Sequence, residues 1–206
     1  MTDETTPEPP RFDLSFDAEP RRLVEVSPLV RRMLQPNSGP FTFRGTNTYV
    51  VGRGDVAVID PGPEDEGNLA ALLAALAGER VRHIVVTHTH RDHSPLAAAL
   101  RRATGAPIVG CAPHRAARAL AEGEIAKLDA ANDLDYAPDH ALADGEAVRG
   151  EGFALVAVAT PGHTMNHLAF HLPEENALFS GDHVMAWSTS IVAPPDGSMS
   201  AYMASL

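Results

Sequence analysis

The feature that most constrains this chain is the segment Thr-His-Thr-His-Arg-Asp-His at residues 87–93, which directly follows an apolar run at residues 81–86. In extended backbone successive side chains alternate in direction, so His88 and His90 point to the same side and can bind one metal ion. Asp92 and His93, at the turn that follows, can reach a second metal ion beside the first. Imidazole and carboxylate ligands together suit zinc best, and iron or manganese can replace it. The segment therefore predicts one loop that serves two metal ions.

Strands and helices alternate around this loop. Apolar residues at helical spacing, with starts and stops typical of helices, predict three helices, over residues 63–78, 94–105 and 113 to about 122. Short β-branched or apolar runs predict a hairpin over 47–60 and strands over 81–86 and 107–111. The polar stretch 123–140 is expected to be a connection with weak helical character. This alternation predicts an α/β layered fold.

Two later segments each place one further candidate ligand just past a strand. Strands are expected at residues 153–159, 167–172 and 177–180. Thr-Pro-Gly-His-Thr at 160–164 puts His163 on a turn that glycine permits, and Phe-Ser-Gly-Asp at 179–182 does the same for Asp182. The predicted ligands are therefore His88, His90, Asp92, His93, His163 and Asp182.

Several other polar residues near these motifs are weaker candidates. His183 adjoins Asp182 but is expected to point elsewhere. His167 and His171 alternate along an expected strand, and His167, four residues after His163, is the candidate for supporting a ligand from behind. Cys111, the single cysteine, is expected to be a small core residue.

Composition limits the remaining classes of protein. Residues 1–18 are acidic and proline-rich and predict a disordered tail, and residues 19–206 are expected to form one domain. The N-terminus lacks the apolar core of a signal peptide, and no run of about 18 apolar residues occurs, so a membrane partner is not expected. With one cysteine no intramolecular disulfide is possible, which favours the cytoplasm. The formal net charge of -11 disfavours RNA as a partner.

The chain resembles the metallo-β-lactamase superfamily in its motifs and in their order. These motifs are Asp60, the histidine and aspartate segment at 87–93, His163 and Asp182. Longer segments at 45–49, 160–167 and 175–182 resemble the β-lactamase-like-two group, whose animal members are endoribonucleases. Thr-Pro-Gly-His-Thr is also similar to a segment of glyoxalase II, a thioesterase. The resemblance implies an αββα sandwich that holds two zinc ions at one edge.

The resemblance also implies a role for each candidate residue. It places His88, His90 and His163 on the first zinc, Asp92 and His93 on the second, with Asp182 bridging the two and Asp60 supporting the ligands from behind. The superfamily usually adds a last histidine ligand in a Gly-His-Gly turn beyond the position of Asp182. Because the chain ends at Leu206 without such a turn, we expect the domain to be truncated at its C-terminus and the second zinc to be bound more weakly.

These features favour a zinc-dependent hydrolase of a small thioester, lactone or related ester. Two metals roughly 3.5–4 Å apart would share a water, lower its pKa towards about 7 and so present a bridging hydroxide as the nucleophile. Asp92 is the candidate catalytic residue that accepts the proton of this water and passes it to the leaving group. A metal-dependent endoribonuclease or phosphodiesterase, and a non-enzymatic metal-binding domain, are the alternatives. A homo-oligomer is also compatible with the sequence.

Overall fold

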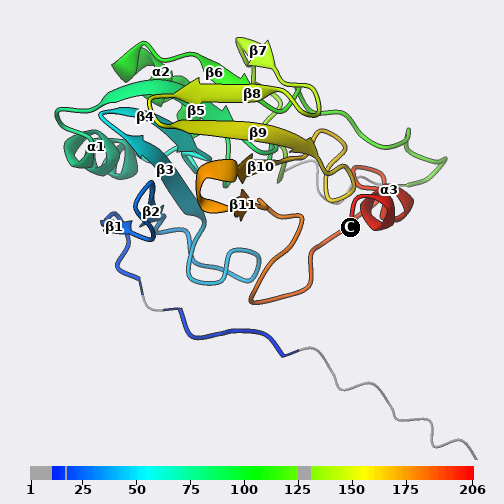
Figure 1. Ribbon diagram of the computed structural model, residues 1–206. Coiled ribbons are helices and arrows are strands. Elements are labelled where there is room, and N and C mark those ends of the chain that lie inside the picture. The colour runs from blue at the N-terminus through cyan, green and yellow to red at the C-terminus, as the bar shows by residue number, and fades with distance from the viewer. Residues whose placement is uncertain (1–10, 17, 125–130) are drawn as a thin grey trace, which may run out of the picture.

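The computed structural model describes residues 11–16, 18–124 and 131–206, so part of the predicted tail 1–18 and of the connection 123–140 lies outside the described residues. Two β-sheets lie face to face, and helices flank them (Figure 1). The helices are α1 (Glu66–Ala75), α2 (Leu96–Thr104) and α3 (Met199–Ala204), with a short 3-10 helix η2 (Pro173–Glu175). None of the described helices has the length and apolar character needed to cross a bilayer.

The first sheet has seven strands that follow one another in chain order. They are β1 (Leu23–Glu25), β2 (Val30–Leu34), β3 (Asn47–Arg53), β4 (Asp55–Ile59), β5 (Arg80–Val86), β6 (Ile108–Gly110) and β7 (His140–Ala141). Strands β1 to β4 pair antiparallel, whereas β4 to β7 pair parallel. Helix α1 connects β4 to β5 and helix α2 connects β5 to β6, as parallel strands require a crossover.

The second sheet is antiparallel, in the order β11 (Ala177–Phe179), β10 (Leu168–Leu172), β9 (Phe153–Ala159) and β8 (Ala147–Gly150). One cluster of buried apolar side chains joins both sheets to the outer helices, and it includes Val58, Ile84, Leu100, Leu155 and Phe170. Strand β4 from Val56 onward and the end of β5 from Ile84 to Val86 are apolar and buried, because the helices cover one face and the second sheet the other. The α/β class and the sandwich of two sheets between helices expected from the sequence are therefore confirmed.

Residues 87–93, which we call the metal loop, are flanked by two helices that begin later than expected. Helix α1 starts at Glu66 rather than near Pro63, because the carboxylate of Asp65 caps it by accepting the backbone N–H of Asn68 at 2.7 Å. Helix α2 starts at Leu96, one residue after Pro95. It ends as expected at Gly105, whose φ of 73° is in the left-handed region.

The helix predicted over residues 113 to 122 is wrong. The structure has no helix there, and most of these side chains are exposed, so an apolar face could not have been buried. The backbone N–H of Ala117 instead donates to the carbonyl oxygens of Pro195 and Asp196. This segment is thus hydrogen-bonded to the loop before α3, and it does not form the hydrogen bonds to residues four positions earlier that a helix requires.

A partly buried ion pair ties the first sheet to the turn after α1. The guanidinium of Arg31 donates to both carboxylate oxygens of Glu79, at 2.5 and 2.9 Å, and to the carbonyl of Gly52 at 3.1 Å. The hydrogen bond from Arg31 is the main cause that holds the pKa of Glu79 below its ordinary value of 4.5. Glu79 therefore stabilises the folded state above its unfolded pKa, and this contribution is lost as the pH falls through the lower folded-state pKa.

We expect Glu79→Gln to lower the free energy of unfolding at neutral pH by about 1–3 kcal/mol, since it leaves the buried Arg31 charge uncompensated. Urea unfolding measures this difference. As the pH falls below about 4.5, the difference between the variant and the wild type should shrink, because Glu79 of the wild type is protonated first in the unfolded state and, at still lower pH, in the folded state. Glu151→Gln, at an exposed position, is the control and should leave stability unchanged. If Glu79→Gln lowered the free energy of unfolding by the same amount at every pH, the charge of Glu79 would not be what stabilises the fold.

Candidate metal centre

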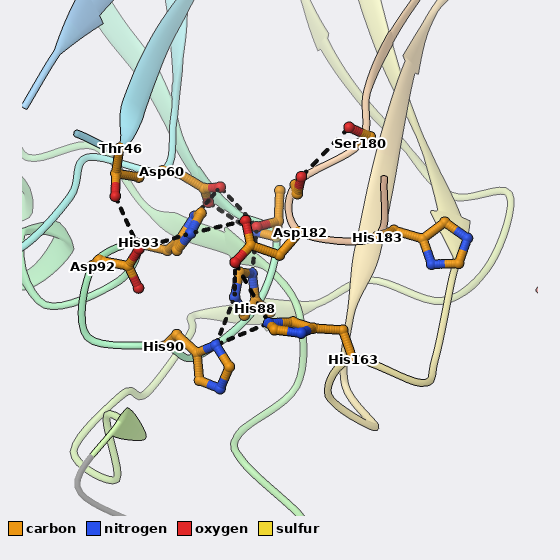
Figure 2. A network of polar contacts seen from close by, with 12 residues as sticks. Thr46, Asp60, His88, His90, Asp92, His93, His163, Ser180, Asp182 and His183 are labelled. Atoms are coloured by element: carbon orange, nitrogen blue, oxygen red, sulfur yellow. Dashed lines mark hydrogen bonds and ion pairs between the residues drawn. The ribbon is translucent and has the colours of Figure 1, made fainter. Parts of the chain in front are cut away.

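The predicted ligands come together from both sheets at one edge of the sandwich. Four of them lie in the loop after β5, between that strand and α2. His163 follows β9 and Asp182 follows β11, so the second sheet supplies the other two. Figure 2 shows these side chains pointing toward one another from their separate loops. The structure thus brings the six residues together.

The first group consists of His88, His90, His163 and Asp182. Each offers one nitrogen or oxygen atom, and these four atoms all lie within 4.8 Å of one another. Nδ1 of His90 is 3.1 Å from Nε2 of His88 and 3.0 Å from Nε2 of His163. Oδ2 of Asp182 is 3.5 Å from Nε2 of His163 and 3.9 Å from that of His88. Three imidazoles and a carboxylate therefore face a common point.

Hydrogen bonds behind the rings fix which nitrogen of His163 and His88 carries a proton. Nδ1 of His163 lies 2.5 Å from the carbonyl oxygen of Ile191, which can only accept, so this nitrogen donates. The Thr87 hydroxyl donates to Asp60 at 2.7 Å and therefore accepts from Nδ1 of His88 at 3.0 Å. In both rings Nε2 is left with a lone pair that points into the cluster.

Asp60 holds the metal loop from behind. Its Oδ1 accepts the backbone N–H of Thr87 at 2.8 Å, and its Oδ2 accepts the Thr87 hydroxyl and, at 2.8 Å, Nδ1 of His93. Asp60 is itself buried and adopts a positive φ of 48°, an uncommon conformation for a residue other than glycine. This single carboxylate thus orients His93 directly and His88 through Thr87, which is the geometry expected of a residue that supports ligands.

The second group consists of His93, Asp92 and Asp182. Nε2 of His93 is 3.4 Å from Oδ2 of Asp92 and 3.5 Å from Oδ1 of Asp182. Oδ2 of Asp92 also accepts the Thr46 hydroxyl at 2.9 Å. Because Oδ2 of Asp182 faces the first group and Oδ1 faces the second, this carboxylate lies between the two groups.

Electrostatics differ sharply between the two groups. Burial, followed by repulsion from neighbouring imidazoles, holds the pKa of His88 well below 6.5 and lowers that of His90 to about 3. Burial alone would also lower the pKa of His93, but Asp92, Asp182 and Asp60 outweigh it and raise this pKa well above 6.5. His88 and His90 are thus held neutral at the first group, and carboxylates gather around the second. Both environments favour a bound cation.

The donor set fits a divalent metal. Among the nitrogens that meet at the first group, those of His88 and His163 have no proton to offer, so hydrogen bonding satisfies the cluster only in part. Three imidazole nitrogens and one carboxylate oxygen at these separations are a set that zinc accepts in tetrahedral geometry. Asp92, His93 and the second oxygen of Asp182 offer a smaller set beside it.

His167 supports the centre more closely than the sequence suggested. It is buried, and its Nε2 accepts the backbone N–H of Asp182 at 3.2 Å while Nδ1 donates to the Thr160 hydroxyl at 2.7 Å. Burial, and then the nearby His163, hold the pKa of His167 well below 6.5, so it stays neutral. In the sequence, its position four residues after His163 was the signal that pointed to this supporting role. His183 instead points away from Asp182 (Figure 2), and its Nε2 lies 3.0 Å from the Ser205 carbonyl.

The fold and this centre define the class of the protein. The chain belongs to the metallo-beta-lactamase superfamily, since the family model matches residues 41–206. Among curated proteins, it is 36% identical over 175 residues to the atrochrysone carboxyl ACP thioesterase AgnL7 of Paecilomyces divaricatus, covering 82% of this chain and 48% of that protein. It is 34% identical over 175 residues to a beta-lactamase-like protein 2 homolog of Caenorhabditis elegans, covering 82% of this chain and 54% of that protein. The chain therefore spans about half the length of the curated relatives that it matches.

Solved structures share the fold. A beta-lactamase domain protein from Burkholderia ambifaria superposes with a TM-score of 0.69 at 22% identity, covering 94% of this chain and 66% of that one. The ETHE1 protein of Myxococcus xanthus superposes with a TM-score of 0.62 at 23% identity, covering 86% of this chain and 67% of that one. At this level of identity, the likeness extends to the arrangement of sheets and helices.

Proposed function

We propose that this domain is a zinc-dependent hydrolase of thioesters, with a small acyl group carried on an acyl carrier protein as the preferred substrate. The observation that carries the proposal is the cluster of three imidazoles and a bridging carboxylate, which lies beside two surface pockets. Several curated relatives are named as thioesterases for acyl carrier proteins, which supports a thioester over a lactone or another ester.

In this proposal His88, His90, His163 and Asp182 hold the first zinc ion, and Asp92, His93 and Asp182 hold the second. Bound zinc would polarise the scissile carbonyl as a Lewis acid and make a water nucleophilic near neutral pH. No protein nucleophile is then needed. Cys111, the single thiol, is fully buried, and burial raises its pKa, so it is not available for attack on a substrate.

Asp92 is the proposed proton carrier. Its Oδ2 is fixed by the Thr46 hydroxyl at 2.9 Å and lies on the lining of both pockets that meet the centre. Burial alone would raise the pKa of Asp92, but the neighbouring His93 outweighs it and lowers this pKa, so the carboxylate is ionised and able to accept a proton. It would then release that proton to the departing thiolate.

We expect Asp92→Asn to lower kcat by about 10²- to 10⁴-fold when zinc is saturating, because the amide keeps the hydrogen bond from Thr46 but cannot accept the proton. Steady-state kinetics over a zinc titration separate this loss from weaker metal binding. Thr46→Val, which removes the hydroxyl contact and leaves the carboxylate, should have a smaller effect. Unchanged turnover of Asp92→Asn at full zinc occupancy would rule out the proton transfer.

The proposed function is tested with a panel of substrates on the zinc-reconstituted protein. The panel contains an acyl-pantetheine thioester, an acyl lactone and single-stranded RNA, and each reaction is repeated with a His90→Ala variant. We expect hydrolysis of the thioester that depends on His90. Cleavage of RNA alone would overturn the proposal in favour of an endoribonuclease, and no metal uptake after reconstitution would favour a non-enzymatic domain.

The remaining expectations are part of the same proposal. The domain would comprise residues 19–206. Residues 1–18 would form the tail, and the described part of this tail, residues 11–16, lies outside helices and strands. The single cysteine supports a reducing, cytoplasmic location. Small molecules or carrier-bound acyl groups would be the partners, and a homo-oligomer stays a prediction.

A further inference from the structure

Two pockets meet over the metal centre and differ in their lining. The larger, of about 590 Å³, extends from Asp92, His93 and Asp182 to a group of residues that we call the arginine cleft: Arg32, Arg44, Phe16, Phe43, Tyr49 and Trp187. The smaller, of about 350 Å³, lies on the side of His90 and His163, and we call it the apolar pocket after Ile191 and Ala193, which line this pocket only; Phe41 and Met185 line both pockets, and Arg91 is also part of its lining. Both linings include Asp92 and Asp182, so the two spaces adjoin at the site where a bond would be broken.

Arg32 is placed in the cleft by the register of the first sheet. It pairs with Tyr49 on β3, and Tyr49 pairs with Ile59 on β4, so the three side chains lie in a row on one face of the sheet. Ile59 directly precedes Asp60, which holds the metal loop. Neighbouring strands are about 5 Å apart, so Arg32 lies about 10 Å along this row from Ile59.

Arg32 has no anionic partner among the described residues. Its guanidinium lies over the ring of Phe16, at 4.3 Å from the centroid, and its Nε is buried without a hydrogen-bond partner. Arg31, the preceding residue on the strand, points to the other face and forms a bidentate pair with Glu79. A half-buried arginine that leaves its charge uncompensated beside a cleft is expected to bind an anion from outside the protein.

Arg44 adds a second positive charge to the same cleft. It is exposed, lies 5.3 Å from the centroid of the Phe43 ring and forms no ion pair in the part of the chain that the structure describes. Phe43 in turn stacks on Trp187, with centroids 5.3 Å apart and an interplanar angle of 13°. The cleft thus combines flat apolar surface with two guanidinium groups that form no ion pair with any described residue.

We propose that the arginine cleft binds the phosphate of the pantetheine arm of a carrier thioester while the apolar pocket receives the acyl group. This assignment rests on the proposed function and deepens it. A thioester has two unlike halves, and the two pockets on either side of the centre match them: an anionic, extended arm beside Arg32 and Arg44, and an apolar chain beside Ile191 and Ala193. Arginine is well suited to a phosphate, because its planar group donates two parallel hydrogen bonds.

The single tryptophan gives a direct test that needs neither metal nor turnover. Trp187 lines the arginine cleft, so its fluorescence reports a ligand bound there. We expect pantetheine 4′-phosphate to bind about tenfold more tightly than pantetheine, since a charge-assisted hydrogen bond is worth about that factor. Arg32→Gln and Arg44→Gln should each remove this preference. Arg102→Gln, at an exposed position on α2, is the matched control and should retain it.

Equal affinities for the two ligands, or an equal loss in Arg102→Gln, would overturn the proposal. Binding of a single-stranded oligonucleotide that is tighter than that of pantetheine 4′-phosphate and depends on Arg32 would also overturn it, in favour of a nucleic-acid groove. Because Arg44 is exposed, its variant is expected to fold even if Arg32→Gln does not.

Kinetics distinguish a failure of this assignment from a failure of the proposed function. Arg44→Gln should raise KM about tenfold more for acyl-pantetheine 4′-phosphate than for acyl-pantetheine, whereas the control Arg102→Gln should leave the kinetics with both substrates unchanged. If no thioester is hydrolysed, the proposed function fails, and the fluorescence titration still decides whether the cleft binds the phosphate. If both thioesters are hydrolysed with the same KM, the function stands and the assignment of the cleft fails.

Discussion

A His90→Ala variant is expected to lose zinc binding at the first position and to lose hydrolysis by more than about 100-fold, since even residues behind metal ligands contribute about 10- to 100-fold. Nδ1 of His90 lies between Nε2 of His88 and Nε2 of His163, at 3.1 and 3.0 Å, so its removal takes the central nitrogen out of the group. The ring is not part of the apolar core, so folding should be retained.

Metal content after reconstitution and steady-state turnover measure this effect. His140→Ala is the control, because His140 is exposed and its nearest ion-pair partner is Glu146, at 3.5 Å. Asp182→Ala should weaken both metal positions, whereas His183→Ala should spare them. Full zinc occupancy of the first position in His90→Ala would refute the assignment of that residue.

Gly162→Ala is expected to lower the free energy of unfolding by about 2–4 kcal/mol and to weaken zinc binding with it. Gly162 has a φ of 149°, and a Cβ there would lie 2.4 Å from Cα and Cβ of Tyr202 on α3. The backbone of the turn must therefore move away from α3, or α3 must move. Since His163 is the next residue, either shift would displace its ring from the other ligands.

Gly152→Ala is a matched control for this prediction. Gly152 also has a positive φ, of 75°, but no atom lies within 4 Å of the position of its Cβ, so the substitution should cost roughly 1 kcal/mol from backbone strain alone. Thermal unfolding measures the stability of the two variants, and zinc titration measures their metal affinity. The difference between the variants gives the effect of the clash with α3, since both share the backbone strain. Equal effects of Gly162→Ala and Gly152→Ala would show that close packing against α3 does not position His163.

The sequence predicted those parts of the fold whose patterns are local. The hairpin at 47–60, the strand before the metal loop and the strands β9, β10 and β11 of the second sheet were found because β-branched or apolar runs end at glycine or polar residues, whereas β8 was not predicted. The stop of α2 at Gly105 follows from the same kind of signal. The ligand candidates were found because glycine-containing turns place His163 and Asp182 at strand ends.

Other features depend on contacts that a local pattern does not contain. Strands β1 and β2 were not predicted, because β2 alternates poorly: Arg31 is buried against Glu79, which is 48 residues away. The wrong helix after Pro113 had helical composition, but its backbone N–H groups are used by residues near 195. The role of His167 rests on a backbone N–H of Asp182, and no spacing rule identifies such a contact.

The division of the ligands between the two sheets has a consequence for how the chain acquires its centre during folding. Residues 88–93 follow β5 of the first sheet, whereas His163 and Asp182 follow β9 and β11 of the second, so neither sheet alone presents the first group. The ligands can meet only after the faces of the sandwich have docked through side chains such as Leu155 and Phe170. A fragment that contains one sheet should therefore bind zinc no better than an unstructured peptide with the same histidines, and mixing the two halves should restore binding at the rate at which the sheets associate.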